Sequence, residues 1–523
     1  MGTPRNVLFI MCDQLRADHL SCYGHPYLHT PNIDALAKRG VRFERAFVQS
    51  GVCGPSRMSY YTGRYVSSHG ATWNRVPLSI NEITLGEYLR GRQMDLALAG
   101  KTHVVPDKKG MERLGLDGDS EIAALLREGC FSLVDRYDGH HAEPHGGYAN
   151  YLRRHGYDSN DPWTDFVIGA IDENGMQVSG WNMRNVHLPA RVAKEHSETA
   201  YTTSQAIDFI SSRGEMPWVL HLSYVKPHWP YMAPAPYHNM YSLEQCLPVK
   251  RTKQELERQH PVLAAYRQQE ECANFMRDEV VQKVRPAYQG LIKQLDDELG
   301  RLWEALEQSG RWDDTLIVFT ADHGDYLGDH WLGEKEQFYD TIQRVPYLVY
   351  DPSADANGTR GLSMSHFVEA IDTVPTILDG LGIDIPSHRI EGRSLLALTR
   401  NNGMLPESGW RDAVFSELDY SFREARRTLG RHPGECKAWM VRTDDWKYVH
   451  WQGLPAQLFD LKNDPDEFHD LGTDASHEAV RAAMRERLLG WFSSLKRRTT
   501  ISYDEVERAT NRHKQAGVFF GVW

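Results

Sequence analysis

The sequence predicts an α/β fold: a large mixed, mainly parallel sheet sandwiched by helices, with a smaller C-terminal α+β subdomain. Three observations predict it. Short apolar runs alternate with stretches of helical periodicity, most of these runs end directly in charged residues, and the pattern changes near residue 401. Near-continuous apolar strands that alternate with helices indicate a parallel sheet covered on both faces. We therefore expect a main domain over residues 1–400 and a subdomain over residues 401–523.

Five apolar runs have the length of buried strands. They cover residues 7–12, 96–99, 218–225, 316–320 and 345–350. The first four lead into Asp13, into Lys101 and His103, into His228, and into Asp322 with His323. Function gathers outside the carboxyl ends of the strands in such sheets. The convergence of acids, imidazoles and an amine at four strand ends predicts a catalytic centre.

Between these runs, apolar residues from Tyr288 to Leu306 recur at three- and four-residue steps, which predicts an amphipathic helix. A second helix is expected after the acidic and Ser/Thr-rich residues 195–199. Residues 105–200 are rich in Gly, His and aromatic residues, and we expect a loop-like insertion that covers the site. His140, His141 and His145 in this stretch are interpreted as a solvated loop, because no acidic partner repeats at ligand spacing.

The region after residue 401 contains short runs separated by turns, at 413–418, 438–442, 447–451 and 457–461. They fit an antiparallel sheet, followed by a helix over about 477–495. The last residues, 518–523, are too apolar for a free end. We expect this tail to dock on the body or on another subunit, and the protein to form a homo-oligomer, a dimer or a tetramer.

Composition narrows the class of protein. Hydrophobic residues make up 41% and charged residues 25%, as in ordinary globular proteins. No run approaches the ~18 apolar residues of a spanning helix, and no signal peptide is evident, so we expect a cytoplasmic protein without a membrane partner. The formal net charge of −12 argues against nucleic acid as a partner, although a local basic pocket can still bind a small anionic substrate. The 7 cysteines form no C-x-x-C pair, which argues against a disulfide framework or a zinc site.

The sharpest local signal is Cys53-Gly54-Pro55-Ser56-Arg57, which precedes a predicted helix over residues 58–63. Proline is well tolerated in a first helical turn, and the helix N-terminus favours negative charge near Cys53. Arg57 lies one turn further on, where it can hold an oxyanion. On these grounds alone, a half-buried structural cysteine is an equal alternative.

Taken together, the motifs resemble the sulfatase family of the alkaline phosphatase superfamily, whose signature is Cys-x-Pro-Ser-Arg. Further matching segments follow in family order at residues 13–14, 63–64, 100–103, 226–228, 320–325, 333–335, 459–461 and 464–465. The resemblance covers nearly the whole chain and implies an alkaline phosphatase-like fold. Within the family, the chain is most similar to the branch of phosphonate monoester hydrolases and related arylsulfatases.

The resemblance implies two cofactors. One is formylglycine, made from Cys53 by a formylglycine-generating enzyme, and the other is one divalent metal ion, Ca²⁺ or Mn²⁺. The expected metal-binding residues are Asp13, Gln14, Cys53, Asp322 and His323. Carboxylate and amide oxygens suit a hard cation, and a histidine nitrogen is better tolerated by Mn²⁺ than by Ca²⁺. A thiolate suits such an ion poorly, whereas the hydrate of formylglycine can bind the ion and attack the ester.

The expected catalytic residues are Cys53, Arg57, His103, His228 and Lys335, and the expected substrate-binding residues are Lys101, Asn74, His228 and Lys335. The cations would neutralise the transferring group. The resemblance assigns His228 and Lys335 to the ester oxygens and the leaving group, with His228 as general acid. It assigns His103 to the formylglycine hydroxyls and Asn74 to a substrate oxygen.

We therefore expect a hydrolase of small anionic esters, namely sulfuric esters of the arylsulfatase type. The alternative is a phosphonate monoester or phosphodiester hydrolase with the same site, and a remote alternative is an inactive metal-binding protein. The related phosphonate monoester hydrolases tend to have uncharged hydroxyl residues where this chain has Lys101 and His103. The extra cation favours an ionised sulfuryl group, which decides for the sulfatase.

Overall fold

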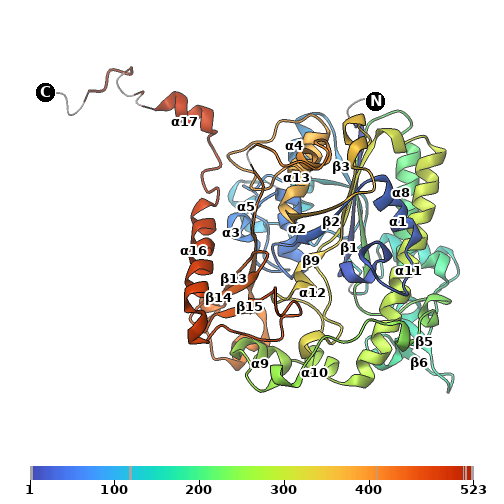
Figure 1. Ribbon diagram of the computed structural model, residues 1–523. Coiled ribbons are helices and arrows are strands. Elements are labelled where there is room, and N and C mark those ends of the chain that lie inside the picture. Colours follow the sequence, from blue (N-terminus) through green and yellow to red (C-terminus); the bar gives the residue numbers. More distant parts are fainter. Residues whose placement is uncertain are drawn as a thin grey trace.

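The computed structural model describes residues 4–116, 120–139, 141–407, 409–510, 512 and 515–519. A nine-stranded sheet forms its centre (Figure 1). In spatial order its strands are β11 (Ser363–Glu369), β2 (Val41–Phe47), β10 (Tyr347–Tyr350), β8 (Thr315–Ala321), β1 (Asn6–Asp13), β7 (Val219–Pro227), β3 (Leu96–Gly100) and β4 (Phe131–Arg136), while β9 (Arg344–Val345) also pairs with β2.

Strand directions confirm the mixed, mainly parallel sheet. β8, β1, β7, β3 and β4 are parallel neighbours, whereas β10 runs antiparallel to both β8 and β2. In the register, Cys12 lies beside Ala321, and Gly100 lies beside Ser223. The carboxyl ends of four adjacent strands therefore meet at one edge of the sheet.

Helices cover both faces of this sheet (Figure 1). One face carries α1 (Pro31–Arg39), α8 (Glu198–Ser212) and α11 (Asp278–Gln308), and the other carries α2 (Cys53–Thr62), α4 (Leu85–Arg90) and α13 (Thr373–Gly380). The predicted helices around residues 202–209 and 288–306 are confirmed as α8 and α11. The shorter helices are α3 (Val66–His69), α5 (Lys108–Arg113), α6 (Glu121–Arg127), α7 (Gly147–Arg154), α9 (Pro261–Arg267), α10 (Glu270–Phe275), α12 (Asp340–Gln343), α14 (Leu396–Thr399), α15 (Glu424–Thr428) and α17 (Tyr503–Ala509).

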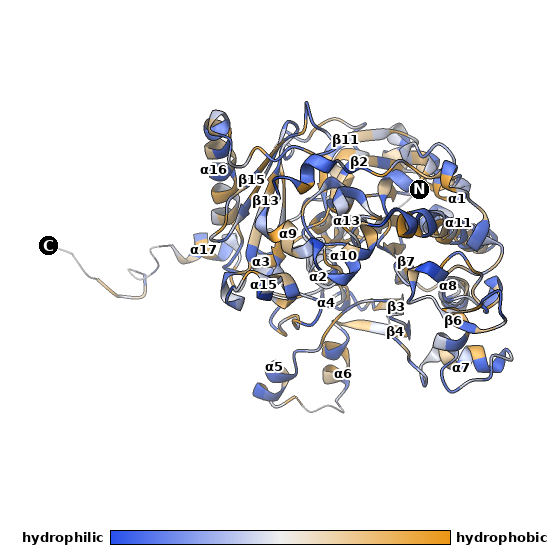
Figure 2. Ribbon diagram, turned by 90° about the horizontal axis from the view of Figure 1, so that it is seen from below, coloured by the Kyte–Doolittle hydropathy of each residue, from blue (hydrophilic) through white to orange (hydrophobic). Residues whose placement is uncertain are grey.

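The stretch 105–200 is more regular than the expected loop. β4 pairs with β3 and ends the main sheet, which corrects the prediction for this segment. β4 is an edge strand with mostly half-exposed residues, so its sequence lacks the apolar run of a buried strand. Beyond it, β5 (Gly169–Ile171) and β6 (Gln177–Ser179) form a hairpin, and Figure 2 shows α5 and α6 projecting at a distance from α7 and β6. His141 and His145 are exposed, and His140 lies outside the described residues.

The C-terminal antiparallel sheet is confirmed. It consists of β12 (Val414–Asp419), β13 (Lys437–Arg442), β14 (Trp446–Trp451) and β15 (Gln457–Asp460), and α16 (Glu478–Ser494) packs against it. Residues 495–499, directly after α16, still contact the body: Leu495 is buried, and the N–H of Lys496 donates to Glu391 at 2.8 Å. From α17 onward the chain extends away from the body (Figure 1), and Val518 and Phe519 are exposed. These two residues of the expected docking segment therefore do not pack on the body, and residues 520–523 lie outside the described residues. Docking on a second subunit stays a prediction.

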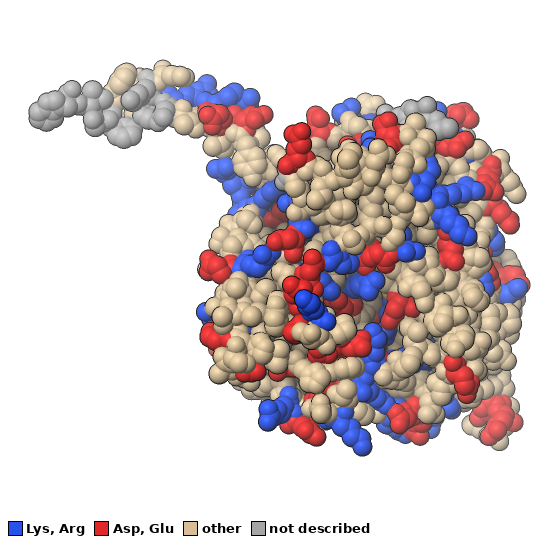
Figure 3. All heavy atoms as spheres, viewed as in Figure 1, with Lys and Arg blue, Asp and Glu red and all other residues tan. Residues whose placement is uncertain are grey.

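Acidic and basic side chains are interspersed over the face shown in Figure 3. No helix in the described part of the chain combines the length and the apolar character that a membrane crossing needs.

Candidate active site

Polar residues at the ends of four adjacent strands form the base of the site. Asp322 and His323 follow β8, Asp13 ends β1, His228 follows β7, and Lys101 follows β3. All five side chains are buried, with at most 1% of their surface exposed. Charged residues are almost never fully buried unless they are paired. The sheet therefore concentrates charge at one point, as the sequence predicted.

Helix α2 brings Cys53 to the same edge. A helix is confirmed here, but it covers Cys53–Thr62 and not residues 58–63, so the motif itself forms its first turns and Cys53 is its first residue. Ser56 donates a hydrogen bond through Oγ to the carbonyl oxygen of Asp322 at 2.6 Å. The backbone N–H of Gly54 donates to Asn74 Oδ1 at 2.7 Å, and a Cβ at position 54 would lie 2.8 Å from the Asn74 Cα. The close approach of these two backbones requires glycine at position 54.

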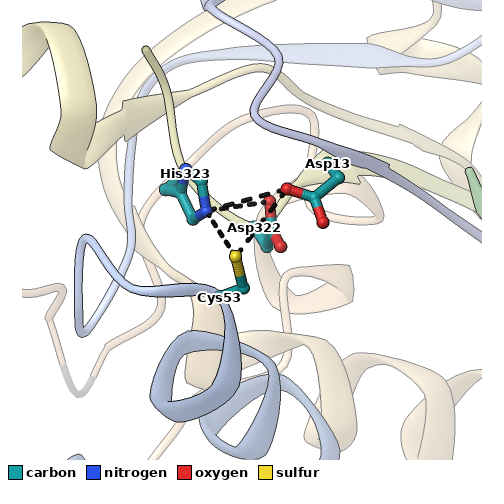
Figure 4. A group of neighbouring side chains, drawn as sticks. All are labelled: Asp13, Cys53, Asp322 and His323. Atoms are coloured by element: carbon teal, nitrogen blue, oxygen red, sulfur yellow. Dashed lines mark hydrogen bonds and ion pairs between the residues drawn. The ribbon is translucent and has the colours of Figure 1, made fainter. Parts of the chain in front are cut away.

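Four side chains converge as a candidate metal site: Asp13, Cys53, Asp322 and His323 each offer a ligand atom, and these atoms all lie within 4.8 Å of one another (Figure 4). His323 Nε2 lies 3.1 Å from Cys53 Sγ, 3.8 Å from Asp13 Oδ1 and 3.7 Å from Asp322 Oδ1. The opposite nitrogen, Nδ1, lies 2.8 Å from the Gly324 carbonyl oxygen and therefore carries the proton in the neutral ring, which leaves Nε2 able to bind a cation.

Gln14, the remaining predicted metal ligand, adjoins this cluster. Its backbone is left-handed (φ 66°), and its N–H donates to Asp322 Oδ1 at 3.0 Å. Its Nε2 donates to Asp325 Oδ2 at 2.6 Å, so that Oε1 faces the Lys335 ammonium at 3.4 Å. Two carboxylates, an amide oxygen and an imidazole nitrogen fit a divalent ion of the Ca²⁺ or Mn²⁺ kind. The sulfur of Cys53 is the one poor ligand for such an ion, and an oxygen at that position would fit.

Arg57 holds the two carboxylates in place. It donates through Nε to Asp322 at 2.7 Å, through Nη2 to Asp13 at 3.2 Å, and through Nη1 to Ser223 Oγ at 2.8 Å and to the carbonyl oxygen of Lys101 at 2.9 Å. With these bonds in place, the oxyanion contact expected of Arg57 does not agree with its geometry. Burial raises the pKa of Asp13, but the ammonium of Lys101, which pairs with it, and the guanidinium of Arg57 hold that pKa well below its usual range.

Lys335 and His228 lie on the same side of Cys53. Lys335 Nζ is 3.0 Å from Cys53 Sγ and 3.0 Å from His228 Nε2. His228 Nδ1 lies 2.6 Å from the Trp229 carbonyl oxygen, which fixes the ring with Nε2 toward Lys335. The ammonium of Lys335 is therefore a fixed positive group beside residue 53, as the neutralisation of a tetrahedral anion requires.

The two remaining predicted residues lie at the border of the cluster. His103 follows β3, is half-buried with a φ of 58°, and its backbone N–H donates to Asp138 at 3.5 Å. Asn74 is half-buried beside the first turn of α2 and contacts Gly54 through Oδ1. Hydrogen bonds and ion pairs thus join nine of the predicted residues (Asp13, Gln14, Cys53, Arg57, Lys101, His228, Asp322, His323 and Lys335), while Asn74 and His103 adjoin them.

Residues outside the predicted set also support the cluster through hydrogen bonds and ion pairs. Lys226 pairs with Glu198 at 3.0 Å and donates to the carbonyl oxygens of His228 at 3.2 Å and Pro230 at 2.9 Å, which fixes the turn that carries His228. Asp325 accepts from Gln14 and from the Tyr231 hydroxyl, each at 2.6 Å. Lys226 and Asp325 belong to motifs that are visible in the sequence, whereas no local pattern marks Glu198.

Comparisons with known proteins agree with this geometry. The sequence model of the family described as Sulfatase matches residues 5–383, and that described as N-sulphoglucosamine sulphohydrolase, C-terminal, matches residues 328–493. The chain is 32% identical over 527 residues to the multifunctional alkaline phosphatase superfamily protein PehA of Trinickia caryophylli, covering 96% of this chain and 98% of that protein. It is 28% identical to an arylsulfatase of Clostridium perfringens, covering 89% and 90%.

Two solved structures are similar over nearly the whole chain. The phosphonate monoester hydrolase of Agrobacterium radiobacter has a TM-score of 0.81 and 31% identity, covering 94% of this chain and 95% of that one. The phosphonate monoester hydrolase SpPMH of Silicibacter pomeroyi has a TM-score of 0.84 and 28% identity, covering 96% and 98%. These matches show an alkaline phosphatase-like fold.

Proposed function

Because the chain belongs to the sulfatase family and is a hydrolase of the alkaline phosphatase superfamily, we propose that it cleaves sulfuric esters of the arylsulfatase type with formylglycine at position 53. One divalent ion, Ca²⁺ or Mn²⁺, would be held by Asp13, Gln14, Asp322 and His323. The observation that carries this proposal is the convergence of Cys53 with three metal-type ligands within 4.8 Å, at the N-terminus of a buried helix.

When present, the ion supplies Lewis-acid stabilisation of the ester oxygens, and formylglycine supplies an oxygen nucleophile. Residues of the chain do the rest. Arg57 and Lys101 hold the carboxylates of the metal site. Lys335 neutralises the transferring group. The adjacent His228, protonated at both ring nitrogens, delivers the Nε2 proton to the leaving oxygen and keeps the Nδ1 proton on the Trp229 carbonyl oxygen. Asn74, whose Oδ1 is bonded to Gly54, offers its amide N–H groups to a substrate oxygen, and His103 is assigned the proton transfer that releases the product.

A second candidate function is hydrolysis of phosphonate monoesters or phosphodiesters at the same site. The likeness to two phosphonate monoester hydrolases over at least 94% of this chain favours it. Lys101 and His103 favour the sulfatase, because the phosphonate monoester hydrolases that the chain resembles tend to have uncharged hydroxyl residues at these positions. Sulfate and phosphonate monoesters are both tetrahedral monoanions, so we expect one activity to dominate and the other to be measurable.

The test combines a chemical and a kinetic measurement on protein from its native host. Mass spectrometry of the peptide that contains residue 53 should show an aldehyde. The value of kcat/KM should be higher for an aryl sulfate than for the matched aryl phosphonate, and Cys53→Ala should lose at least about a thousandfold. A fully active protein with an unmodified thiol would overturn the proposed nucleophile, and a higher kcat/KM for the phosphonate would establish the second function.

A further inference from the structure

An aromatic pocket lies beside the residues that are proposed to act on the leaving group. Its volume is about 280 Å³. The lining includes Trp181, Trp229, Tyr231, Phe275, Glu271 and Glu334. These residues come from four segments that are far apart in the sequence, and none of them takes part in the proposed metal site. The fold thus builds a second, mainly apolar space next to the charged one.

This pocket and the site share a wall. Trp229 directly follows His228, and Glu334 directly precedes Lys335. The Trp229 Nε1–H donates to Glu334 Oε1 at 3.1 Å, which fixes the indole, and Lys335 Nζ lies 5.5 Å from the centroid of its ring. Trp229 thus lines the pocket and at the same time faces the ammonium of Lys335.

Trp181 forms the outer part of the pocket. It follows the β5–β6 hairpin, its ring lies 5.6 Å from that of Trp229, and 49% of the residue is exposed. Stacking and edge contacts between aromatic rings stabilise a complex beyond the area that they bury. An aromatic ligand in this pocket would cover the exposed face of Trp181. Ligand binding would then account for a large apolar side chain that is otherwise open to solvent.

Size and charge restrict the ligand. An apolar cavity of about 150 Å³ holds benzene, so 280 Å³ accommodates a group of one or two rings. The described lining carries three carboxylates, those of Glu270, Glu271 and Glu334, and no Lys or Arg. Arg423 pairs with Glu271 at 3.1 Å and with Glu334 at 3.0 Å, while Glu270 is exposed at the rim. The lining therefore disfavours anionic groups.

We propose that this pocket binds the organic part of the leaving alcohol, and that the preferred substrates are esters of uncharged or cationic aromatic alcohols with one or two rings. The proposal rests on the proposed ester hydrolysis, since it assigns the alcohol side of the bond to His228 and Lys335. It adds a specificity pocket in which Trp181 and Trp229 are the two principal contacts.

Binding of the free alcohol tests the pocket without any turnover. The probe is 2-naphthol, followed by tryptophan fluorescence or calorimetry on the full chain. We expect Trp181→Ala to weaken its binding about tenfold, and Trp181→Phe to retain most of it. Met176→Ala removes another exposed side chain from the turn of the same hairpin and should have no effect. A naphthol that carries a sulfonate should bind at least about tenfold more weakly than 2-naphthol.

Kinetics then separate this proposal from the proposed function. With 2-naphthyl sulfate, Trp181→Ala should raise KM about tenfold at nearly constant kcat, because the contact with the naphthyl group is lost equally in the ground state and the transition state. Inhibition by inorganic sulfate should stay unchanged, since sulfate does not occupy the pocket. Equal naphthol binding and equal KM in Trp181→Ala and the unaltered protein would overturn the pocket. Failure to hydrolyse any aryl sulfate or phosphonate, with naphthol binding still dependent on Trp181, would overturn the proposed function alone.

Discussion

The floor of the site and its side wall are built in different ways. The floor consists of Asp13, Arg57, Lys101, Asp322 and His323. Each of these side chains is fully buried, and each follows or ends a strand of the central sheet or lies in the first turns of α2. Charges pair within the floor, and the sheet register sets their spacing. The floor is therefore as rigid as the core of the main domain.

The side wall is a loop, residues 334–337, that carries Lys335. Glu334, Glu336 and Gln337 have left-handed backbones, with φ of 64°, 81° and 55°, which costs of order 1–3 kcal/mol for each residue. Arg423, from the C-terminal subdomain, pairs with Glu334 at 3.0 Å and with Glu336 at 2.6 Å. The sheet thus positions the proposed metal ligands, whereas the C-terminal subdomain holds the loop that carries Lys335.

The largest expected effect comes from Arg57→Ala, which breaks the floor. It leaves Asp13 and Asp322 without their shared partner, so we expect a loss of about 3–5 kcal/mol in the free energy of unfolding and at least about a thousandfold in kcat/KM. Arg285→Ala is the matched control, because Arg285 is equally buried but pairs with Asp329. It should cost comparable stability with a much smaller effect on activity, measured by urea unfolding and steady-state kinetics. Equal losses of activity in the two variants would show that Arg57 supports activity only through stability, as a buried arginine outside the site does.

Removal of the metal tests the floor without a mutation. A chelator should abolish activity and lower the free energy of unfolding by about 3 kcal/mol if the ion is present at a hundredfold its Kd. Added Mn²⁺ or Ca²⁺ should restore both, and the better of the two identifies the ion. Metal content, activity and Tm are measured on the same sample. A preparation shown to be free of metal that keeps its activity and Tm would contradict the assigned ligands.

Arg423→Ala should loosen the side wall and leave the floor intact. We expect kcat to fall about tenfold through displacement of Lys335, with partial rescue in Arg423→Lys. Burial raises the pKa of Glu336 to about 7 although Arg423 opposes this, and Arg423 holds the pKa of Glu334 below its usual value.

The stability of this variant should depend on pH in a defined direction. A carboxyl group whose pKa is raised in the folded state stabilises the fold below its unfolded pKa near 4.5, and this contribution is lost as the pH rises through the folded pKa. Without Arg423 the pKa of Glu336 rises further, and the pKa of Glu334 rises from its lowered value. The deficit relative to the unaltered protein should therefore be larger at pH 8 than at pH 5, as unfolding curves at the two pH values would show. A deficit that is independent of pH would mean that Arg423 does not act through these carboxylates.

The smallest expected effect comes from Gly54→Ala. The added methyl would lie 2.8 Å from the Asn74 Cα, so we expect a loss of about 1–3 kcal/mol and a shift of Cys53 that lowers kcat. Gly490→Ala, within α16 and with no atom within 4 Å of the added carbon, should instead stabilise by about 0.5–1 kcal/mol. Thermal unfolding of both variants measures the contrast. A neutral Gly54→Ala would show that the start of α2 can move.

Much of the floor was predictable because the strands that position it can be recognised from short stretches of sequence. β1, β7 and β8 are buried along their whole length, so their apolar runs are visible, and the polar residue after each run marks the edge of the sheet. Helix α2 was predictable from Pro55 in its first turn. The edge strand β4 was missed, since half-exposed residues leave no apolar run.

The side wall and the pocket were not predictable from local patterns. Trp181, Trp229, Phe275 and Glu334 share no spacing along the chain and meet only after the insertion, α10 and the loop after β8 have packed together. The contacts of Arg57 were not predictable either, because the acceptors of its guanidinium lie on or directly after four strands that pair only in the folded sheet.

The side chain of Cys53 has no exposed surface once α2 has packed against the sheet. The proposed conversion of Cys53 to formylglycine requires access to this side chain, and the folded chain does not give it. Under that proposal, the modifying enzyme has to reach the nascent or unfolded polypeptide before the sheet assembles. A molecule that folds too early keeps its thiol until it unfolds again, so the yield of active protein in a host with little of that enzyme should rise when synthesis is slowed.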